Sequence, residues 1–329
     1  MLEVMIISLR GARLKKEGSG VDSVREWDSF WRLMSRSGNT ELPTSARELD
    51  QFFLEIYSNL TPLSPTILDL GAGNGALSRL LMAHRANAHL ANDMDMIVLD
   101  ASIDALMMNT ASNDVLAVNA LLEELPLRNE SIDLVVSQFG VEYAKKPIWN
   151  QVFMLLKQGG SLCVAMHSKG SQIFFEYQQN DGMSSLILGS DFYLHLAQVN
   201  ADSEKFSPRS LERALSELIK SGRYLSKQLV KSSMLGQLLS HYLEVCERCL
   251  MSEVEVNCVD ILRWLKVAET ELIAFFERIR SMIKSALSQE DFFELQDLLM
   301  ELDFSIKQAG EIRLKSGEVL AFKLHAQKK

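Results

Sequence analysis

The sequence predicts an α/β fold in which a mostly parallel sheet is interrupted by a long helical segment. A short apolar segment at residues 67–70 leads into a glycine-rich loop and then into a helical pattern, which is the order of a βα unit. Further apolar segments of strand length follow along the chain. Residues 169–289 then show helical patterns only, and two strand-like segments come after them. The sequence thus has strand-like segments on both sides of a long helical stretch.

The glycine-rich loop directly follows a segment with the character of a buried parallel strand. Ile67–Leu70 contains one charged residue, Asp69, whose carboxylate would face a ligand at the strand end. Gly71, Gly73 and Gly75 alternate with small residues, so the backbone can turn tightly and approach a ligand. The loop predicts a nucleotide-binding site, although loops with three glycines also occur for structural reasons alone.

This spacing resembles motif I of the class I S-adenosylmethionine-dependent methyltransferases. Dinucleotide sites have Gly-x-Gly-x-x-Gly, whereas here the third glycine comes one residue sooner and an acid stands two residues before the first. The resemblance implies a Rossmann-like, seven-stranded, mostly parallel sheet, here with an α-helical insertion after the fifth strand. It implies S-adenosylmethionine as methyl donor and S-adenosylhomocysteine as product, with the methionine end held by Asp69, Gly71, Gly73 and Gly75.

The second strand is expected at Ala88–Asn92, which ends at Asp93. An acid at this strand end can accept hydrogen bonds from both ribose hydroxyls. Asp95 and Asp100 are alternatives, because the apolar run 96–99 could also be a strand. We prefer Asp93 because roughly 20 residues between glycine loop and acid is the usual separation. Asp93 or Asp95 could instead cap the next helix.

The third strand is expected at Val115–Val118 and ends at Asn119 and Ala120. In the family that the chain resembles, this corner holds the adenine amino group, usually through an aspartate. Asn119 departs from that pattern, but an amide oxygen could accept the same hydrogen bond.

The fourth and fifth strands are expected at Ser131–Ser137 and Ser161–Met166. The resemblance covers roughly residues 60–168 and the last thirty. Ligands bind at the carboxyl ends of such strands, and we therefore assign Ser137 to the donor site. His167, Glu142 and Tyr143 leave the same edge and are the candidate catalytic residues.

Methyl transfer from a sulfonium is an in-line displacement, in which alignment alone can contribute about 7–11 kcal/mol. An imidazole at His167 could take a proton from the acceptor. Glu142 could act as a base or bind a cationic acceptor. His167 could instead only pack at the strand end, and Glu142 could pair with Lys145 or Lys146.

The chain is expected to consist of a lead-in at residues 1–20, a methyltransferase domain at 21–168 and 290–329, and a helical insertion at 169–289. The insertion is either a substrate-selecting lid or a surface for homodimerisation. The closing strands are expected at Phe304–Ala309 and Val319–Ala326. Before motif I, Trp27, Trp31 and Tyr57 follow helical patterns and would line a substrate cavity or pack in the core.

Composition favours a soluble cytoplasmic enzyme. The chain of 329 residues has 34 basic and 43 acidic residues, a net charge of −9, which lowers the expectation of a nucleic-acid substrate without excluding it. No apolar run reaches the length of a membrane span, and residues 1–9 are too short for a signal peptide core. Cys246 and Cys249 fall in a helical pattern, so no metal site is expected there.

The sequence thus predicts an S-adenosylmethionine-dependent methyltransferase that acts on an oxygen, nitrogen or carbon of a small molecule. No Asn-Pro-Pro-Tyr or Asp-Pro-Pro-Tyr follows the fourth strand, which argues against methylation of an adenine amino group. An RNA or other nucleic-acid methyltransferase and a non-catalytic cofactor-binding protein are the alternatives. The acceptor itself does not follow from the sequence.

Overall fold

The computed structural model describes residues 27–28, 30–32, 46–60, 64–87, 94–112, 114–145, 147–201, 206–229, 234–251 and 258–329. The chain divides into two compact units. Residues 20–175 and 281–329 form the unit that carries the sheet, and residues 176–280 belong to the helical unit.

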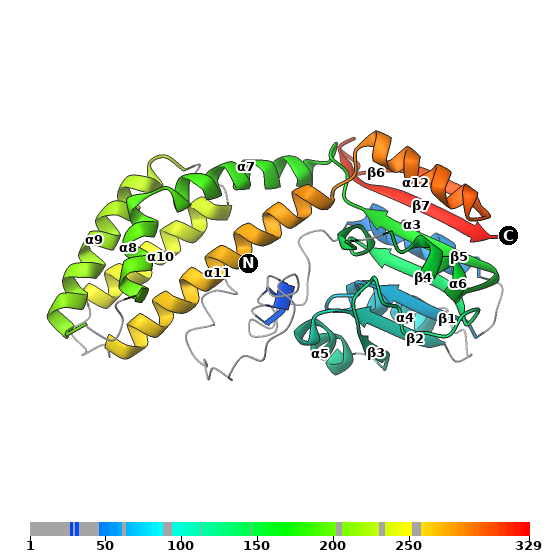
Figure 1. The fold of residues 1–329 in the computed structure, drawn as a ribbon, viewed down its shortest axis with the longest axis horizontal. Helices are drawn as coiled ribbons and strands as arrows, with labels where there is room; N and C mark the ends of the chain where they lie inside the picture. Colours follow the sequence, from blue (N-terminus) through cyan, green and yellow to red (C-terminus); the bar gives the residue numbers. More distant parts are fainter. Residues whose placement is uncertain are drawn as a thin grey trace. The chain divides into compact units, whose positions relative to one another are not determined.

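The sheet has seven strands in the order β3-β2-β1-β4-β5-β7-β6 (Figure 1). The pairs formed by β1 to β5 are parallel, and β7 runs antiparallel to both β5 and β6. This arrangement confirms the expected Rossmann-like, mostly parallel sheet. The strands are β1 (Thr66–Leu70), β2 (Asp95–Asp100), β3 (Leu116–Asn119), β4 (Ile132–Gln138), β5 (Leu156–Met166), β6 (Phe304–Arg313) and β7 (Val319–Lys328).

The second strand differs from the preferred expectation. It spans Asp95–Asp100 and pairs along its length with β1, from Thr66 opposite Asp95 to Leu70 opposite Leu99. Its four apolar residues, 96–99, are all buried, which explains why this run forms the strand. The interval 88–93, including Asp93, lies outside the described residues. The acid at the carboxyl end of β2 is therefore Asp100, one of the alternatives.

Helices cover both faces of the sheet, which makes the unit doubly wound. On one face, α6 (Trp149–Leu155) and α12 (Gln289–Glu301) bury apolar residues against strand positions such as Leu68 and Leu70. On the other face, α3 (Arg47–Ser58) and α4 (Ala76–Asn87) pack against Ile67. Two further elements follow β2 and β4: α5 (Ile103–Ser112) and the 3-10 turn η2 (Val141–Tyr143).

Between β5 and α12, most of the described residues are helical. The helices are α7 (Gln172–Leu188), α8 (Asp191–Ala201), α9 (Pro208–Ser226), α10 (Met234–Met251) and α11 (Cys258–Ser285). Helix α9 begins at a capping box in which Ser207 and Ser210 bond reciprocally, with Pro208 in the first turn. In the helical unit, the Tyr242 hydroxyl donates to the carbonyl of Ala268, 3.0 Å away, and so ties α10 to α11.

Cys246 and Cys249 are free thiols on α10. Burial raises the pKa of Cys246 to about 12, so this group stays protonated at neutral pH. Within the described residues, no group of three or more His, Cys, Asp or Glu side chains could hold a metal ion. None of the described helices is both long and apolar enough to cross a membrane.

Neighbouring phenylalanines on α12 allow a direct test of the packing. Phe292 is 1% exposed and stacks on Phe322 with the ring centroids 4.4 Å apart. Phe292→Ala should lower the free energy of unfolding by about 3–5 kcal/mol, because it leaves a cavity under the sheet. Phe293, 56% exposed, is the matched control, and Phe293→Ala should change the free energy of unfolding little. Urea unfolding followed by tryptophan fluorescence measures both, and equal midpoints would contradict the packing described here.

Candidate active site

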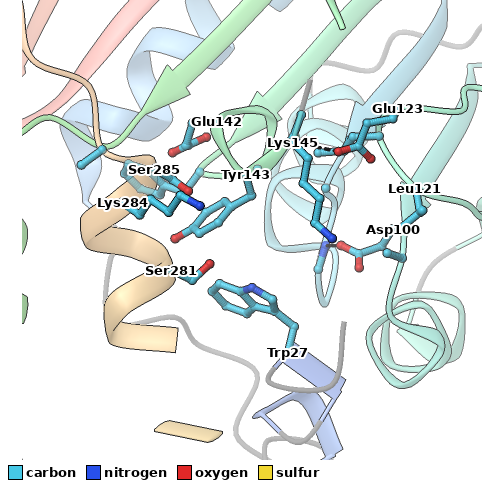
Figure 2. A pocket seen from close by; sticks show the side chains of 18 of the residues that line it. Trp27, Asp100, Leu121, Glu123, Glu142, Tyr143, Lys145, Ser281, Lys284 and Ser285 are labelled. Atoms are coloured by element: carbon cyan, nitrogen blue, oxygen red, sulfur yellow. Dashed lines mark hydrogen bonds between the residues drawn. The ribbon is translucent and has the colours of Figure 1, made fainter. Parts of the chain in front are cut away.

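A cavity of about 750 Å³ lies at the carboxyl ends of the parallel strands, within the unit that carries the sheet. Ligand sites usually have about 300–1,000 Å³, so a nucleoside and a small second molecule are of suitable size. Figure 2 shows its labelled side chains in two groups. One group consists of Asp100, Leu121, Glu123 and Lys145, and the other of Trp27, Glu142, Tyr143, Ser281, Lys284 and Ser285.

The glycine loop after β1 forms part of the cavity wall through Gly71 and Gly73. Both have positive φ, of 65° and 52°, which favours glycine. A Cβ on Gly71 would lie 2.9 Å from the Cα of Gly140, and one on Gly73 would lie 2.6 Å from a ring carbon of Trp31. Side chains at these positions would therefore collide with the loop after β4 and with the N-terminal helical segment.

The third glycine has a different role. Gly75 has a φ of 78°, and a Cβ there would lie 2.3 Å from the side-chain oxygen of Asn109 on α5. Among the described residues, Gly75 is not part of the cavity wall. It lets the start of α4 approach α5 closely, so two of the three motif glycines shape the cavity and the third shapes the packing behind it.

Asp69 lies beneath the glycine loop rather than on the cavity surface. Its side chain is buried, and Oδ2 accepts a hydrogen bond of 2.7 Å from the Ser78 hydroxyl on α4. Burial raises the pKa of Asp69 to about 7, against the opposing effect of the Ser78 hydrogen bond. A nearby positive charge would favour the ionised form, so this position suits a cationic ligand in the cavity.

Asp100 links the end of β2 to the glycine loop. Its Oδ2 accepts from the amide of Gly73 at 2.8 Å, and its Oδ1 accepts from the amide of Ser102, also at 2.8 Å. Asp100 lines the cavity, and burial raises the pKa of its carboxyl group despite these bonds. Asp95, at the opposite end of the same strand, is exposed.

Polar groups at the corner after β3 bond to backbone carbonyls at the end of β2. The Asn119 amide nitrogen donates to the carbonyls of Asp100 and Ala101 at 3.1 and 2.9 Å, and the Ala120 amide donates to the Asp100 carbonyl at 3.3 Å. Neither residue is part of the described cavity wall, where Leu121 and Leu122 stand instead. Asn119 and Ala120 therefore hold the ends of β2 and β3 together and support that wall.

Ser137 is also a supporting residue. Its buried hydroxyl donates to the carbonyl of Leu70 at 2.6 Å and accepts from the amide of Val141 at 3.1 Å. These bonds tie the end of β1 to the turn η2, which carries Glu142 and Tyr143. The close contact between Gly71 and Gly140 described above lies beside this hydroxyl.

Glu142 and His167 form a buried pair at the ends of β4 and β5. Oε1 of Glu142 accepts from the His167 amide at 2.9 Å and lies 2.8 Å from the His167 Nδ1. The side chains are 1% and 8% exposed, respectively. Oε2 of Glu142 is buried and has no hydrogen-bond partner among the described residues. A buried carboxylate oxygen normally has a partner, so a ligand or its proton is the expected complement.

Aromatic rings surround this pair. The His167 ring lies 4.3 Å from Phe139 and 6.0 Å from Tyr143, measured between centroids. Trp27 contacts Tyr143 edge to face at 5.3 Å. Phe139, Glu142, Tyr143 and Trp27 are in the cavity wall, whereas His167 stands behind Glu142. The structure thus brings the three candidate catalytic residues together, with Glu142 and Tyr143 nearest to a ligand.

The N-terminal aromatic residues divide between the two expected roles. Trp27 and Trp31 line the cavity. Tyr57 is 4% exposed and packs in the core, where its hydroxyl lies 3.4 Å from the Met94 sulfur and accepts from Arg85 at 3.1 Å.

Sequence reasoning missed one part of the cavity. Ser281, Lys284 and Ser285 line it from the last turn of α11, and Lys169 lines it from the segment after β5. None of these residues belongs to a recognisable sequence motif. Only the helical spacing of Ser281, Lys284 and Ser285 on one face of α11 could have suggested that they act together.

Part of the sheet-bearing unit matches a known protein family. Residues 68–164 match a family described as a methyltransferase domain. No curated protein matches the chain.

Solved methyltransferase structures are similar to this chain at low identity. One of them comes from the complex between the Haloferax volcanii Trm112 methyltransferase activator and a methyltransferase. It is 20% identical to this chain with a TM-score of 0.35, and the match covers 48% of this chain and 64% of that one. An S-adenosylmethionine-dependent methyltransferase from Mesorhizobium loti is 22% identical, with a TM-score of 0.30 and coverage of 35% and 53%. One from Aquifex aeolicus is 9% identical, with a TM-score of 0.42 and coverage of 87% and 95%. The matches thus span less than two thirds of the first two proteins.

The family match covers β1 to β5, the strands whose carboxyl ends form the cavity. The strand order, the glycine loop and the acid at the end of β2 agree with that match. Residues 68–164 thus match a methyltransferase domain, and the fold around them is consistent with a class I methyltransferase that uses S-adenosylmethionine as methyl donor.

Proposed function

We propose that this methyltransferase transfers the methyl group to an oxygen, nitrogen or carbon atom of a small molecule by in-line displacement. The observation that carries the proposal is one cavity that contains both the glycine loop and the buried carboxylate of Glu142. Asp100, which bonds to the glycine loop, and Glu142 lie in separate groups of the cavity wall (Figure 2), and a cavity of about 750 Å³ is large enough for donor and acceptor together.

The residues present fit the donor. Asp69 lies beneath the loop and Asp100 accepts from its Gly73 amide, and a ligand with a sulfonium and an ammonium group would favour the ionised form of both carboxyl groups. We assign the methionine end to Gly71 and Gly73, with Asp69 acting from beneath the loop and Gly75 shaping it. Asp100 takes the ribose role in place of Asp93, and Leu121 and Leu122 flank the adenine on a corner that Asn119 and Ala120 support.

S-adenosylmethionine, when bound, supplies an electrophilic methyl group, and the sulfur keeps the electron pair of the broken bond. The acceptor atom forms the new bond with its own electron pair and loses a proton if it carries one. Glu142 is placed to take that proton on Oε2, because Oε1 is already engaged by His167. His167 is then a positioning residue, and Tyr143 forms a wall against which the acceptor packs.

The chemistry of the cavity favours a small molecule over nucleic acid. Of its described lining side chains, Asp100, Glu123, Glu142 and Asp291 are acidic and Lys145, Lys169 and Lys284 are basic. A binder of nucleic acid needs a basic excess to neutralise phosphates, and the chain as a whole is acidic. The free thiols of Cys163, Cys246 and Cys249 suit a reducing compartment, so we place the enzyme in the cytoplasm.

Asp100→Ala should weaken the binding of S-adenosylhomocysteine by roughly 1.5–3 kcal/mol, because it removes a charged hydrogen-bonding group. Asp95→Ala is the matched control, since it removes an exposed aspartate from the other end of β2 and should leave affinity unchanged. Calorimetric titration measures both. A loss confined to Asp95→Ala would overturn the assignment.

Donor affinity should depend on pH through Asp69. The pKa of Asp69 is about 7 in the folded chain, whereas an ordinary aspartate has a pKa of 3.8. Protonated Asp69 therefore stabilises the folded state, and this stabilisation is lost as pH rises from about 4 to 7. A bound ammonium favours the carboxylate, so affinity for S-adenosylhomocysteine should fall as pH drops below about 7, by up to about tenfold per pH unit. Calorimetry from pH 5.5 to 7.5 tests this at about half-unit steps. Asp69→Asn should remove the dependence, and an unchanged slope would contradict its origin in Asp69.

Glu142→Gln should reduce methyl transfer by about 10²- to 10⁴-fold, the usual contribution of a general base. Binding of S-adenosylhomocysteine should stay within about twofold, because Glu142 is not among the residues assigned to the donor. The acceptor is first found by screening small metabolites and RNA with radiolabelled donor. Glu123→Gln, which changes another carboxylate in the cavity wall, is the control and should keep its activity. Full activity in Glu142→Gln would exclude the base role, and labelling of RNA alone would exclude the small-molecule proposal.

A further inference from the structure

The last turn of α11 presents three polar side chains to the cavity. Ser281, Lys284 and Ser285 are spaced three and four residues apart and so lie on one helix face. All three line the cavity, and Figure 2 shows them in the same group as Glu142 and Tyr143. They belong to the unit that carries the sheet.

None of these three side chains makes a hydrogen bond or an ion pair with another described residue. This is unusual for serines in helices of this chain. Ser216 and Ser240 donate to carbonyls one turn back, at 2.9 Å in each case. Two hydroxyls and one ammonium therefore stand as free donors at the same edge of the cavity.

Two lysines line this edge of the cavity, and they differ in their partners. Lys169 also lines the cavity, but it pairs with Asp291 at 3.3 Å. Lys284 has no acidic neighbour within ion-pair distance among the described residues. A helix C-terminus favours a lysine in its last turn, which accounts for the presence of a cation. It does not account for two hydroxyls that leave their own helix carbonyls unbonded.

We propose that Ser281, Lys284 and Ser285 bind an oxyanion of the methyl acceptor, either a carboxylate or a phosphate. Ammonium and hydroxyl groups are donors, and an oxyanion accepts several such bonds at once. The body of the acceptor packs on Trp27 and Tyr143, and the atom to be methylated lies toward Glu142. This inference rests on the proposed function and adds the class of acceptor: a small acid with an apolar or aromatic body.

Fluorinated probes test the charge preference without knowledge of the natural acceptor. Four compounds share one ring: 4-fluorobenzoate, 4-fluorophenyl phosphate, the uncharged 4-fluorobenzamide and the cationic 4-fluorobenzylamine. Their dissociation constants are measured by fluorine NMR line broadening with the full chain saturated with S-adenosylhomocysteine. At least one anion should bind about tenfold more tightly than the amide and the amine. The better anion identifies the acid group as carboxylate or phosphate.

Variants assign the preference to the helix turn. Lys284→Met should weaken the anion about tenfold, to the level of the amide, and Lys284→Arg should keep most of the affinity. Ser281→Ala combined with Ser285→Ala should weaken it severalfold. Lys145→Met is the matched control, because it removes another cavity lysine that has no ion-pair partner among the described residues, and it should leave anion binding within about twofold.

The outcomes separate this inference from the proposed function. Calorimetry on the same samples first tests binding of S-adenosylhomocysteine, and its absence in the unmodified chain would overturn the proposed function. Normal donor binding with no anion preference, a preference for the amine, or an unchanged affinity in Lys284→Met would overturn the oxyanion site alone. Retained anion binding in Lys284→Arg shows that the loss in Lys284→Met is not a folding defect.

Discussion

The cavity depends on one hydrogen-bonded junction, the Asp100 carboxylate between the Gly73 and Ser102 amides. This junction fastens the glycine loop after β1 to the end of the neighbouring strand. On its other side, the same loop touches Gly140 at Gly71, and the Ser137 hydroxyl ties β1 to the turn after β4. Three strand ends are thus held together, and the positions of the residues that line the cavity follow from these contacts.

Buried carboxyl groups give the site its chemical character. Asp69, Asp100 and Glu142 all sit where water is scarce, and burying a charge is costly unless it has partners. Asp69 has the Ser78 hydroxyl, Asp100 has two backbone amides, and Glu142 has His167. Each arrangement leaves the carboxyl group able to respond to a cation or a proton in the cavity. The proposed donor, with two positive charges, and the proposed acceptor, which loses a proton, would be complementary to such groups.

The end of α11 joins the sheet-bearing unit at a defined place. Leu287 forms a bridge with Ser168, two residues after β5. The Leu287 amide donates to the carbonyl of His167 at 2.9 Å, and the Leu287 carbonyl accepts from the amide of Lys169 at 2.8 Å. This bridge sets the last turn of α11 beside the residues that follow β5. It explains how residues late in the chain come to line a cavity built mainly from strands β1 to β4.

Local sequence was sufficient for the elements with a single plausible pattern. The strand–loop–helix unit at residues 67–85, the need for glycine at positions 71 and 73, and the strand before Glu142 all follow from it, because burial and backbone conformation leave few alternatives. The second strand could not be chosen this way. Residues 88–92 and 96–99 are both short and apolar, and only pairing with β1 selects the second run and brings Asp100 to the cavity.

The roles of polar side chains were decided by tertiary structure. Asn119 and Ser137 occupy the expected strand ends, and their side chains bond to backbone carbonyls of Asp100 and Leu70. His167 stands behind Glu142 because both its amide and its ring approach the same carboxylate oxygen. The bridge between Leu287 and Ser168 positions Lys284 at the cavity. The sequence by itself therefore determined the donor-binding fold, which rests on local patterns, whereas the acceptor side depends on contacts between distant segments that only the tertiary structure brings together.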